Sequence, residues 1–363
     1  MSAPQQTPVG PAEPAGPGTP AGLPFHLLLT AGRPSRWWAL LGIVMVGVIF
    51  LVAQTVAAVV LAAGLVLGGL SMDEALDRLS GQSEITPSFL ALVNIGWASA
   101  IPAVLLTVWL VHGLHPGWAS SVVRRLRWGW LLTCLGLSVV ALVATLVVSA
   151  LVPAEAGAEL GGGLNEWTST TRDFLLVVLV LTPLQAAGEE YAFRGYLTQA
   201  VGTVLASRIV VVVVPAVLFA LAHGAQDPPV FVDRLAFGLV AGFLVVATGG
   251  LEAAIAMHVL NNLLAFGLTL AFGDMASALD PTGGSWWSLP VTLTQSLVYL
   301  GVVLWVARRR GIAVLGHPLP LGRQQPPQGP PPGPGRGWQG PPGPPYGHGP
   351  GPGPELVGPD PRV

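Results

Sequence analysis

Residues 188–194 (GEEYAFR) directly follow the apolar run DFLLVVLVLTPLQAA, residues 173–187. Two adjacent acids, Glu189 and Glu190, therefore come at the end of a segment of membrane-spanning character. An ionisable side chain at the centre of a membrane helix costs about 3 kcal/mol on insertion scales. Each of these carboxylates therefore needs either a partner or a function.

The composition indicates a polytopic membrane protein. Hydrophobic residues make up 52% of the chain and charged residues 9%, and the mean hydropathy is +0.65, far from the balance of soluble domains. The net charge is −2 and the chain contains no lysine, which excludes a P-loop and argues against nucleic-acid binding. A single cysteine, Cys134, excludes an intramolecular disulfide and a cysteine metal cluster.

Both ends are rich in proline and glycine and are predicted to be disordered, because such segments cannot bury a core. We assign residues 1–36 and 311–363 to tails, residues 37–152 to N-terminal transmembrane helices, and residues 153–310 to a second, functional part. Eight apolar runs between the tails are long enough to span the bilayer. They lie near residues 38–70, 88–112, 128–152, 174–190, 209–224, 231–248, 251–272 and 290–307.

The arginines predict the orientation, because positive residues are retained on the cytoplasmic side. With eight crossings, the arginines at the helix ends all fall on one side and the acidic loops on the other; these arginines are Arg33, Arg36, Arg124, Arg125, Arg127, Arg208 and Arg308 to Arg310. The sequence therefore predicts an all-α bundle of about eight transmembrane helices, with both termini in the cytoplasm and a location in the plasma membrane.

Helical spacing gives the polar residues a geometry. Residues i and i+4 share a face, so Glu190 can pair with Arg194, and His258 lies one turn from Asn262. Glu189 is rotated by about 100° from Glu190. One carboxylate can thus be neutralised by Arg194, while its neighbour is free to act as a general base with a histidine within reach.

Structural roles compete with functional ones at each position. The Glu190–Arg194 pair can equally be a structural ion pair, and Asp233-Arg234 is predicted to lie at the membrane interface. A single transmembrane histidine is often an interhelical hydrogen bonder. Glu189, His223, His258 and Asn262 together, on three helices, favour a shared site. The other histidines are interpreted as incidental residues of loops or tails: His26, His112, His115, His317 and His348.

Three motifs then carry a family resemblance. EEYAFR matches E-E-x-x-x-R, FALAH (residues 219–223) matches F-x-x-x-H, and HVLNN (residues 258–262) matches H-x-x-x-N. In this order, over about residues 174–265, the chain resembles the CPBP family of intramembrane proteases, which includes type II CAAX prenyl endopeptidases and bacteriocin-processing or immunity proteins. The resemblance makes residues 153–310 the expected protease core.

The resemblance implies a role for each motif residue. Glu189 corresponds to the acid that activates water with help from His223, while His258 and Asn262 stabilise the oxyanion, and Glu190 and Arg194 support the site. A zinc ion is the cofactor that the residues leave open, with Glu189, His223 and His258 as candidate ligands. The spacing is not H-E-x-x-H, so the sequence does not select zinc.

We therefore expect an intramembrane endopeptidase that cleaves a membrane-associated protein or peptide near the cytoplasmic face. The partners are that substrate and the lipid bilayer. The main alternative is a non-proteolytic membrane scaffold or immunity-type protein of the same fold, and a small-ion or metal transporter ranks last, because the motifs occupy consecutive helices without an evident inverted duplicate. The expected orientation places His223 on the opposite side from Glu189, unless the fifth helix is short and deep or its predicted boundaries are wrong.

Overall fold

A computed structural model describes residues 22–151, 163–224, 227–279 and 284–319. The described part is all-α apart from one short pair of strands. Its elements in chain order are β1 (Leu23–Pro24), η1 (Phe25–Ala31), α1 (Arg36–Leu67), α2 (Met72–Ser80), α3 (Pro87–Ala98), α4 (Ala100–Leu110), η2 (Pro116–Ala119), α5 (Trp128–Ser149), α6 (Ser169–Val180), α7 (Thr182–Glu190), η4 (Tyr191–Leu197), α8 (Thr198–Val204), α9 (Val210–Gly224), α10 (Pro228–Thr248), α11 (Glu252–Phe272), α12 (Met275–Leu279), α13 (Ser288–Arg310) and β2 (Leu315–Gly316).

Seven helices among the described residues are long and apolar enough to cross a membrane. They comprise Arg36–Leu67, Pro87–Leu110, Trp128–Val148, Ser169–Val204, Pro228–Thr248, Glu252–Phe272 and Ser288–Arg310. The remaining predicted run, near residues 209–224, lies in the shorter apolar helix α9. The predicted all-α, multi-pass architecture is confirmed, whereas the cytoplasmic placement of both termini stays a prediction.

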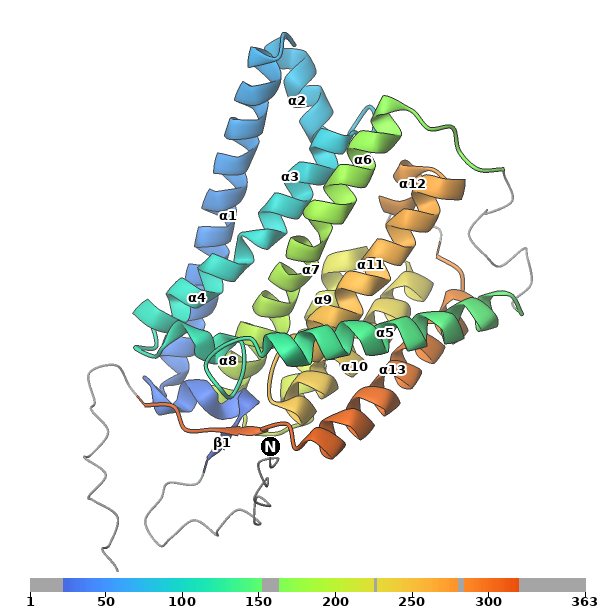
Figure 1. Cartoon of the computed structure of the whole chain (residues 1–363). Helices are drawn as coiled ribbons and strands as arrows, with labels where there is room; N and C mark the ends of the chain where they lie inside the picture. Colours follow the sequence, from blue (N-terminus) through green and yellow to red (C-terminus); the bar gives the residue numbers. More distant parts are fainter. Residues whose placement is uncertain (1–21, 152–162, 225–226, 280–283, 320–363) are drawn as a thin grey trace, which may run out of the picture. The chain divides into compact units, whose positions relative to one another are not determined.

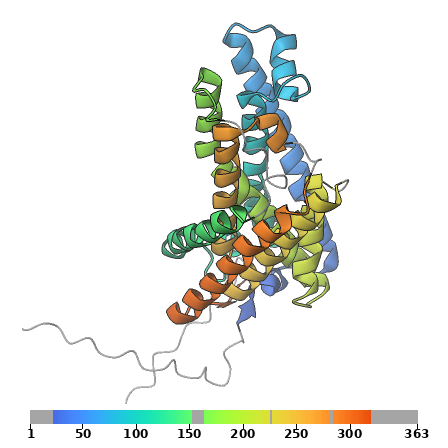
Figure 2. The same cartoon turned by 90° about the vertical axis from the view of Figure 1, so that its right-hand side faces the viewer.

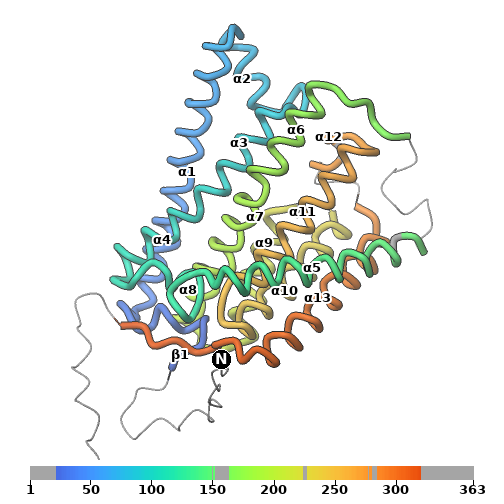
Figure 3. Tube along the Cα trace, viewed as in Figure 1, coloured from blue at the N-terminus to red at the C-terminus, as the bar shows by residue number. Residues whose placement is uncertain are grey.

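The fourth predicted run does not end at the two glutamates. The chain continues from α6 through α7, η4 and α8 as one helical path to Val204 (Figure 3). Pro183 interrupts this path between α6 and α7, because proline lacks the N–H that an unbroken helix needs. The η4 segment is π-helical, a rare conformation that often marks functional sites. Glu189 and Glu190 therefore lie in the interior of the segment, and the predicted helix end at residue 190 was wrong.

The helix α7 lies between α3 and α11, and α9 packs along α10 (Figure 1). The helix α5 crosses α11 and α13, as both Figure 1 and the turned view of Figure 2 show. This packing brings together three segments that are far apart in the sequence, namely α7, the end of α9 and the middle of α11. These are the segments that carry the three motifs.

The structured region extends into both predicted tails. The strand β1 pairs antiparallel with β2, with Leu23 opposite Gly316, and the following turn η1 buries Phe25, Leu28 and Leu29 completely. The tail boundaries predicted at residues 36 and 311 were therefore wrong. Composition located the Pro-Gly segments, but a short apolar segment such as FHLLL gains its burial only from tertiary packing.

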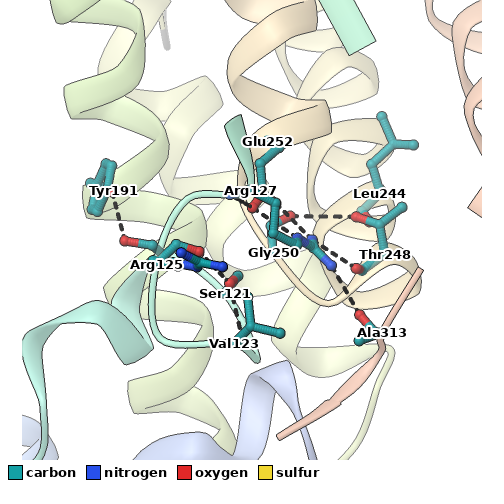
Figure 4. A network of polar contacts seen from close by, with 11 residues as sticks. Ser121, Val123, Arg125, Arg127, Tyr191, Leu244, Thr248, Gly250, Glu252 and Ala313 are labelled. Atoms are coloured by element: carbon teal, nitrogen blue, oxygen red, sulfur yellow. Dashed lines mark hydrogen bonds and ion pairs between the residues drawn. The ribbon is translucent and has the colours of Figure 1, made fainter. Parts of the chain in front are cut away.

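A buried ion pair fixes the start of α11 (Figure 4). Glu252 has no exposed surface, and its two carboxylate oxygens accept hydrogen bonds from Nε and Nη2 of Arg127 at 2.9 and 2.7 Å. The Arg127 guanidinium also donates to the carbonyls of Thr248 and Ala313, each at 3.0 Å. The nitrogens of the guanidinium and the oxygens of the carboxylate all have hydrogen-bond partners, so neither buried charge is left unpaired. Together these contacts connect the ends of α5, α10, α11 and α13. In the sequence, Arg127 indicates only the orientation of the helices, and no motif marks Glu252.

Candidate active site

The two adjacent glutamates face different partners. Glu190 accepts a hydrogen bond from Nη1 of Arg194 at 2.9 Å, and both side chains are fully buried. The expected i,i+4 ion pair is thus present. Glu189 makes no contact of this kind with Arg194; its Oε1 accepts a hydrogen bond from Nε2 of Gln185, one turn earlier.

The free oxygen of Glu189 faces two histidines. Its Oε2 lies 3.5 Å from Nε2 of His223 and 3.7 Å from Nε2 of His258. Glu189 itself is only 1% exposed, and its Oε2 has no hydrogen-bond partner among the described residues. The structure therefore brings Glu189, His223 and His258 together around a single carboxylate oxygen.

His223 reaches this level because its helix is short and runs back beside a long one. The path from Glu189 continues through η4 and α8 to Val204, and α9 starts again at Val210. The number of residues from Glu189 to Val204 is similar to the number from Val210 to His223. Because each helical residue advances 1.5 Å, Glu189 and His223 lie at about the same depth. The conflict with the expected orientation arose from ending the fourth helix too early.

Each histidine has its Nδ1 atom occupied. Nδ1 of His223 lies 2.8 Å from the carbonyl oxygen of Phe219, and Nδ1 of His258 lies 2.8 Å from Oε1 of Glu190. A carbonyl or carboxylate oxygen only accepts, so both Nδ1 atoms carry a proton and donate it. The Nε2 atoms then face Oε2 of Glu189, and Glu190 contacts His258 as well as Arg194.

The formal charges in this cluster do not cancel when both histidines are neutral. Glu189 and Glu190 are two carboxylates and Arg194 is one guanidinium, all of them buried. With neutral histidines the cluster carries one net negative charge, which a single additional proton neutralises. A buried cluster favours neutrality because unpaired charge is expensive in a poorly solvated site.

Aromatic rings complete the surroundings of the polar cluster. The Arg194 guanidinium carbon lies 4.2 Å from the ring centroid of Phe219, a cation–π contact. The rings of Phe219 and Phe237 stand edge-on to His258, at centroid distances of 5.9 and 5.2 Å. These rings restrict rotation of the imidazole. The cluster is less covered at His223, whose side chain is 27% exposed, compared with 2% for that of Glu189.

Asn262 joins the cluster through a residue that the sequence analysis missed. Its Nδ2 donates to Oε1 of Gln185 at 3.1 Å, and Gln185 in turn donates to Glu189. Gln185 is 8% exposed. The signal was present in the sequence, because Gln185 and Glu189 are four residues apart and share a helix face, but an amide in an apolar run fits no motif.

Several other polar residues are buried. Asp233 is only 6% exposed, and its Oδ2 lies 3.6 Å from Nη1 of Arg234; its location at the membrane interface stays a prediction. His26 and His112 are buried too, which corrects their interpretation as incidental loop residues. His115 and His317 are exposed, and His348 lies outside the described residues.

Zinc was left open as a cofactor for Glu189, His223 and His258. In the described part of the chain, no group of three or more His, Cys, Asp or Glu side chains is arranged to hold a metal ion. In this arrangement, Glu189, His223 and His258 do not fit a zinc ion.

Comparisons with known proteins agree with the motifs. Residues 171–264 match the family described as type II CAAX prenyl endopeptidase Rce1-like, which confirms the resemblance expected for about residues 174–265. The chain is also similar to the uncharacterized protein YyaK of Bacillus subtilis (strain 168), with 28% identity over 146 residues. That match covers 37% of this chain and 49% of the relative, so the chain spans about half the length of that relative. No solved structure matches the chain.

Proposed function

We propose that this multi-pass membrane protein, whose residues 171–264 form a domain of the type II CAAX prenyl endopeptidase (CPBP) family, is an intramembrane endopeptidase of the plasma membrane. The observation that carries the proposal is the arrangement around Glu189. One of its oxygens is held by Gln185, and the other faces the Nε2 atoms of two histidines at 3.5 and 3.7 Å. This geometry suits a general base acting on a water molecule.

In the proposed reaction, Oε2 of Glu189 takes a proton from water as the water oxygen attacks the peptide carbonyl carbon. His223 assists because its Nε2 faces the same oxygen, while its Nδ1 is held by the Phe219 carbonyl. The negative charge then moves to the former carbonyl oxygen. Collapse of this intermediate breaks the C–N bond, and the proton held by Glu189 passes to the leaving amine, so one water is consumed.

The oxyanion needs donors, and His258 and Asn262 are assigned this role. His258 lies between the two glutamates, with Nδ1 on Oε1 of Glu190 and Nε2 directed at Oε2 of Glu189. From this position the imidazole presents its Nε2 side to the developing oxyanion. The Asn262 amide supplies a second donor, and such donors commonly contribute about 10²-fold or more in rate.

The substrate is proposed to be a membrane-associated protein or peptide. The scissile bond is expected to approach from the side of His223, which is the more exposed of the two histidines. The matched family is described as a type II CAAX prenyl endopeptidase, so a prenylated C-terminal peptide is the first probe to test.

The decisive experiment separates an enzyme from a scaffold. The purified protein, in phospholipid nanodiscs, is incubated with quenched fluorescent peptides that carry a prenyl anchor, an acyl anchor or no anchor. In parallel, new protein N-termini are quantified in host membranes that express either the wild type or Glu189→Gln. We expect Glu189→Gln to lower cleavage by about 10²-fold or more, as for the loss of general-base help.

Glu252→Gln provides the matched control, because it changes another fully buried glutamate that lies in the Arg127 network instead of the site. This variant should unfold at lower temperature yet keep the cleavage rate of the folded fraction. If Glu189→Gln retains full function in cells and generates the same N-termini as the wild type, the protease proposal fails and the scaffold alternative takes its place.

A further inference from the structure

We propose that Gln185 is a positioning residue that determines which oxygen of Glu189 acts as the base and how the Asn262 amide is turned. The inference deepens the proposed endopeptidase function and rests on it. It concerns a residue outside the three motifs, located one helical turn before the first glutamate.

The Gln185 amide is held at both of its polar atoms. Nε2 donates to Oε1 of Glu189, and Oε1 accepts from Nδ2 of Asn262 at 3.1 Å. The opposite orientation would set a carbonyl oxygen against a carboxylate and an NH₂ group against another NH₂ group. Because both mismatches are repulsive, the amide has one favourable orientation. Gln185 thus links α7 to α11 with a defined polarity.

This link makes the two oxygens of Glu189 different. Oε1 is engaged by the Gln185 amide, whereas Oε2 lacks a hydrogen bond within the described residues and faces both histidines. Without Gln185 the carboxylate could rotate, since carboxylate torsions are broad. Either oxygen could then turn away from the histidines. Gln185 therefore fixes the basic atom on the side where the histidines lie.

The same link orients Asn262. One N–H of the Asn262 amide is used on Gln185, and its Oδ1 accepts from Nδ2 of Asn261 at 3.4 Å. The second N–H of Asn262 remains for the oxyanion. A displacement of about 1 Å in such a group can reduce the catalytic rate by about 10²-fold. Because the Gln185 amide holds Glu189 on one side and Asn262 on the other, losing it should lower the rate of cleavage.

A purely structural role is the competing explanation, because buried amides also stabilise helix–helix contacts in membranes. The two roles predict different measurements. A structural glutamine lowers the unfolding midpoint when it is removed, whereas a positioning glutamine changes the turnover number and the pH dependence of cleavage. The test therefore needs a variant that keeps the shape of the side chain and changes only its donor.

Gln185→Glu is that variant. A single proton shared between the new carboxyl and Glu189 lets residue 185 donate to Glu189 and accept from Asn262, as the amide does. When that proton is lost at higher pH, two carboxylates face one another and the positioning is lost. We expect the rate of Gln185→Glu, relative to wild type at the same pH, to fall by about tenfold or more between about pH 5 and pH 9.

Gln185→Leu removes both hydrogen bonds and should lower kcat by about tenfold to a hundredfold at every pH, with KM changed by less than about threefold. The matched control is Gln199→Leu, which removes a buried amide from the same helical path; Nε2 of Gln199 donates to the Trp118 carbonyl at 2.9 Å, outside the site. This control should lose stability and keep the wild-type pH profile.

All variants are assayed in nanodiscs on the reporter whose cleavage by the wild type depends on Glu189. Wild-type kcat for Gln185→Leu, or a rate for Gln185→Glu that stays parallel to wild type at every pH, overturns the inference and leaves the proposed function intact. If Gln185→Leu does not fold, the pH series on Gln185→Glu decides alone. A wild-type protein whose cleavage does not depend on Glu189 refutes the proposed function, and the inference falls with it.

Discussion

At the residue scale, the buried charges of the site are held by shared contacts. Oε1 of Glu190 accepts hydrogen bonds from both Arg194 and His258, at 2.9 and 2.8 Å. Arg194 has no exposed surface, so Glu190 is its compensating charge. Removing one partner of such a pair costs about 3–5 kcal/mol, because the other charge is left buried and unpaired.

Glu190→Gln is therefore expected to lower the stability of the protein strongly, together with any loss of activity. The double variant Glu190→Gln with Arg194→Gln should recover part of that stability, because the unpaired charge is removed. The wild type, Glu190→Gln, Arg194→Gln and the double variant form a double-mutant cycle. Their unfolding midpoints in detergent measure the coupling between the two residues. Simple addition of the two single effects would show that the pair is not coupled.

His112 provides a prediction on pH. It lies just beyond the end of α4, it is 1% exposed, and its Nε2 lies 3.0 Å from the Tyr196 hydroxyl. Burial, with help from the charge of Arg33, lowers the pKa of His112 from 6.5 to about 4. Between these values the unfolded chain binds a proton that the folded protein does not bind. Stability should therefore decrease as the pH falls from about 6.5 to about 4.

The measurement is the unfolding midpoint between pH 4 and pH 8 for the wild type and for His112→Gln, which cannot titrate in this range. Across this pH window, the free energy of unfolding should change by on the order of 3 kcal/mol less in the variant than in the wild type. Burial also lowers the pKa of His26, so some dependence should remain in the variant. Equal slopes for the two proteins would contradict the assignment to His112.

At the scale of elements, the position of the site depends on the close packing of α7 against α3. A side-chain carbon added at Gly188 would lie 1.9 Å from the carbonyl oxygen of Trp97. No side chain fits at that distance, so α7 can approach α3 only with glycine at this position. Glu189 is the next residue, and its location therefore depends on this approach.

Gly188→Ala should separate α7 from α3 and cost about 1–3 kcal/mol, and cleavage should fall because Glu189 moves with the helix. The control is Gly136→Ala in α5, where an added carbon meets nothing within 4 Å; this change should be neutral or slightly stabilising. Unfolding midpoints and cleavage rates of both variants test the prediction. An unchanged rate in folded Gly188→Ala would argue against it.

At the scale of the whole molecule, the predicted tails contain segments of different kinds. Residues 1–21 and 320–363 are rich in proline and glycine, and from this composition we expect no apolar burial. The segment between residue 21 and α1 contributes three fully buried side chains, those of Phe25, Leu28 and Leu29. Burial of such a side chain stabilises by about 1.5–3 kcal/mol.

Deletion of residues 1–21 and 320–363 should leave the unfolding midpoint of the detergent-solubilised protein nearly unchanged. Extending the N-terminal deletion to residue 29 should lower it strongly. Leu28→Ala in the full chain is the control that keeps the length, and it should cost about 2–5 kcal/mol. A large loss from the first deletion alone would show that one of the Pro-Gly segments packs on the bundle.

The sequence by itself determined the features that depend on local spacing and composition. Long apolar runs specify membrane helices because the backbone must satisfy its own hydrogen bonds in lipid, and the eight runs reappear as helices. The i,i+4 rule placed Glu190 beside Arg194 along one continuous helical path. Through the family resemblance, the motif order marked Glu189, His223, His258 and Asn262 as candidate site residues.

Only the tertiary structure decided the contacts between distant segments. It placed His258 on Glu190, Glu252 on Arg127, and Gln185 between Glu189 and Asn262. It also buried Phe25, which lies in a segment that no periodic pattern marks, and His112, which lies at the end of the predicted run 88–112. The physical reason is that a side chain's partner across a helix interface depends on how far each helix continues and how closely it packs. Helical continuation past Glu190 and the approach that Gly188 permits are both properties of the assembled bundle.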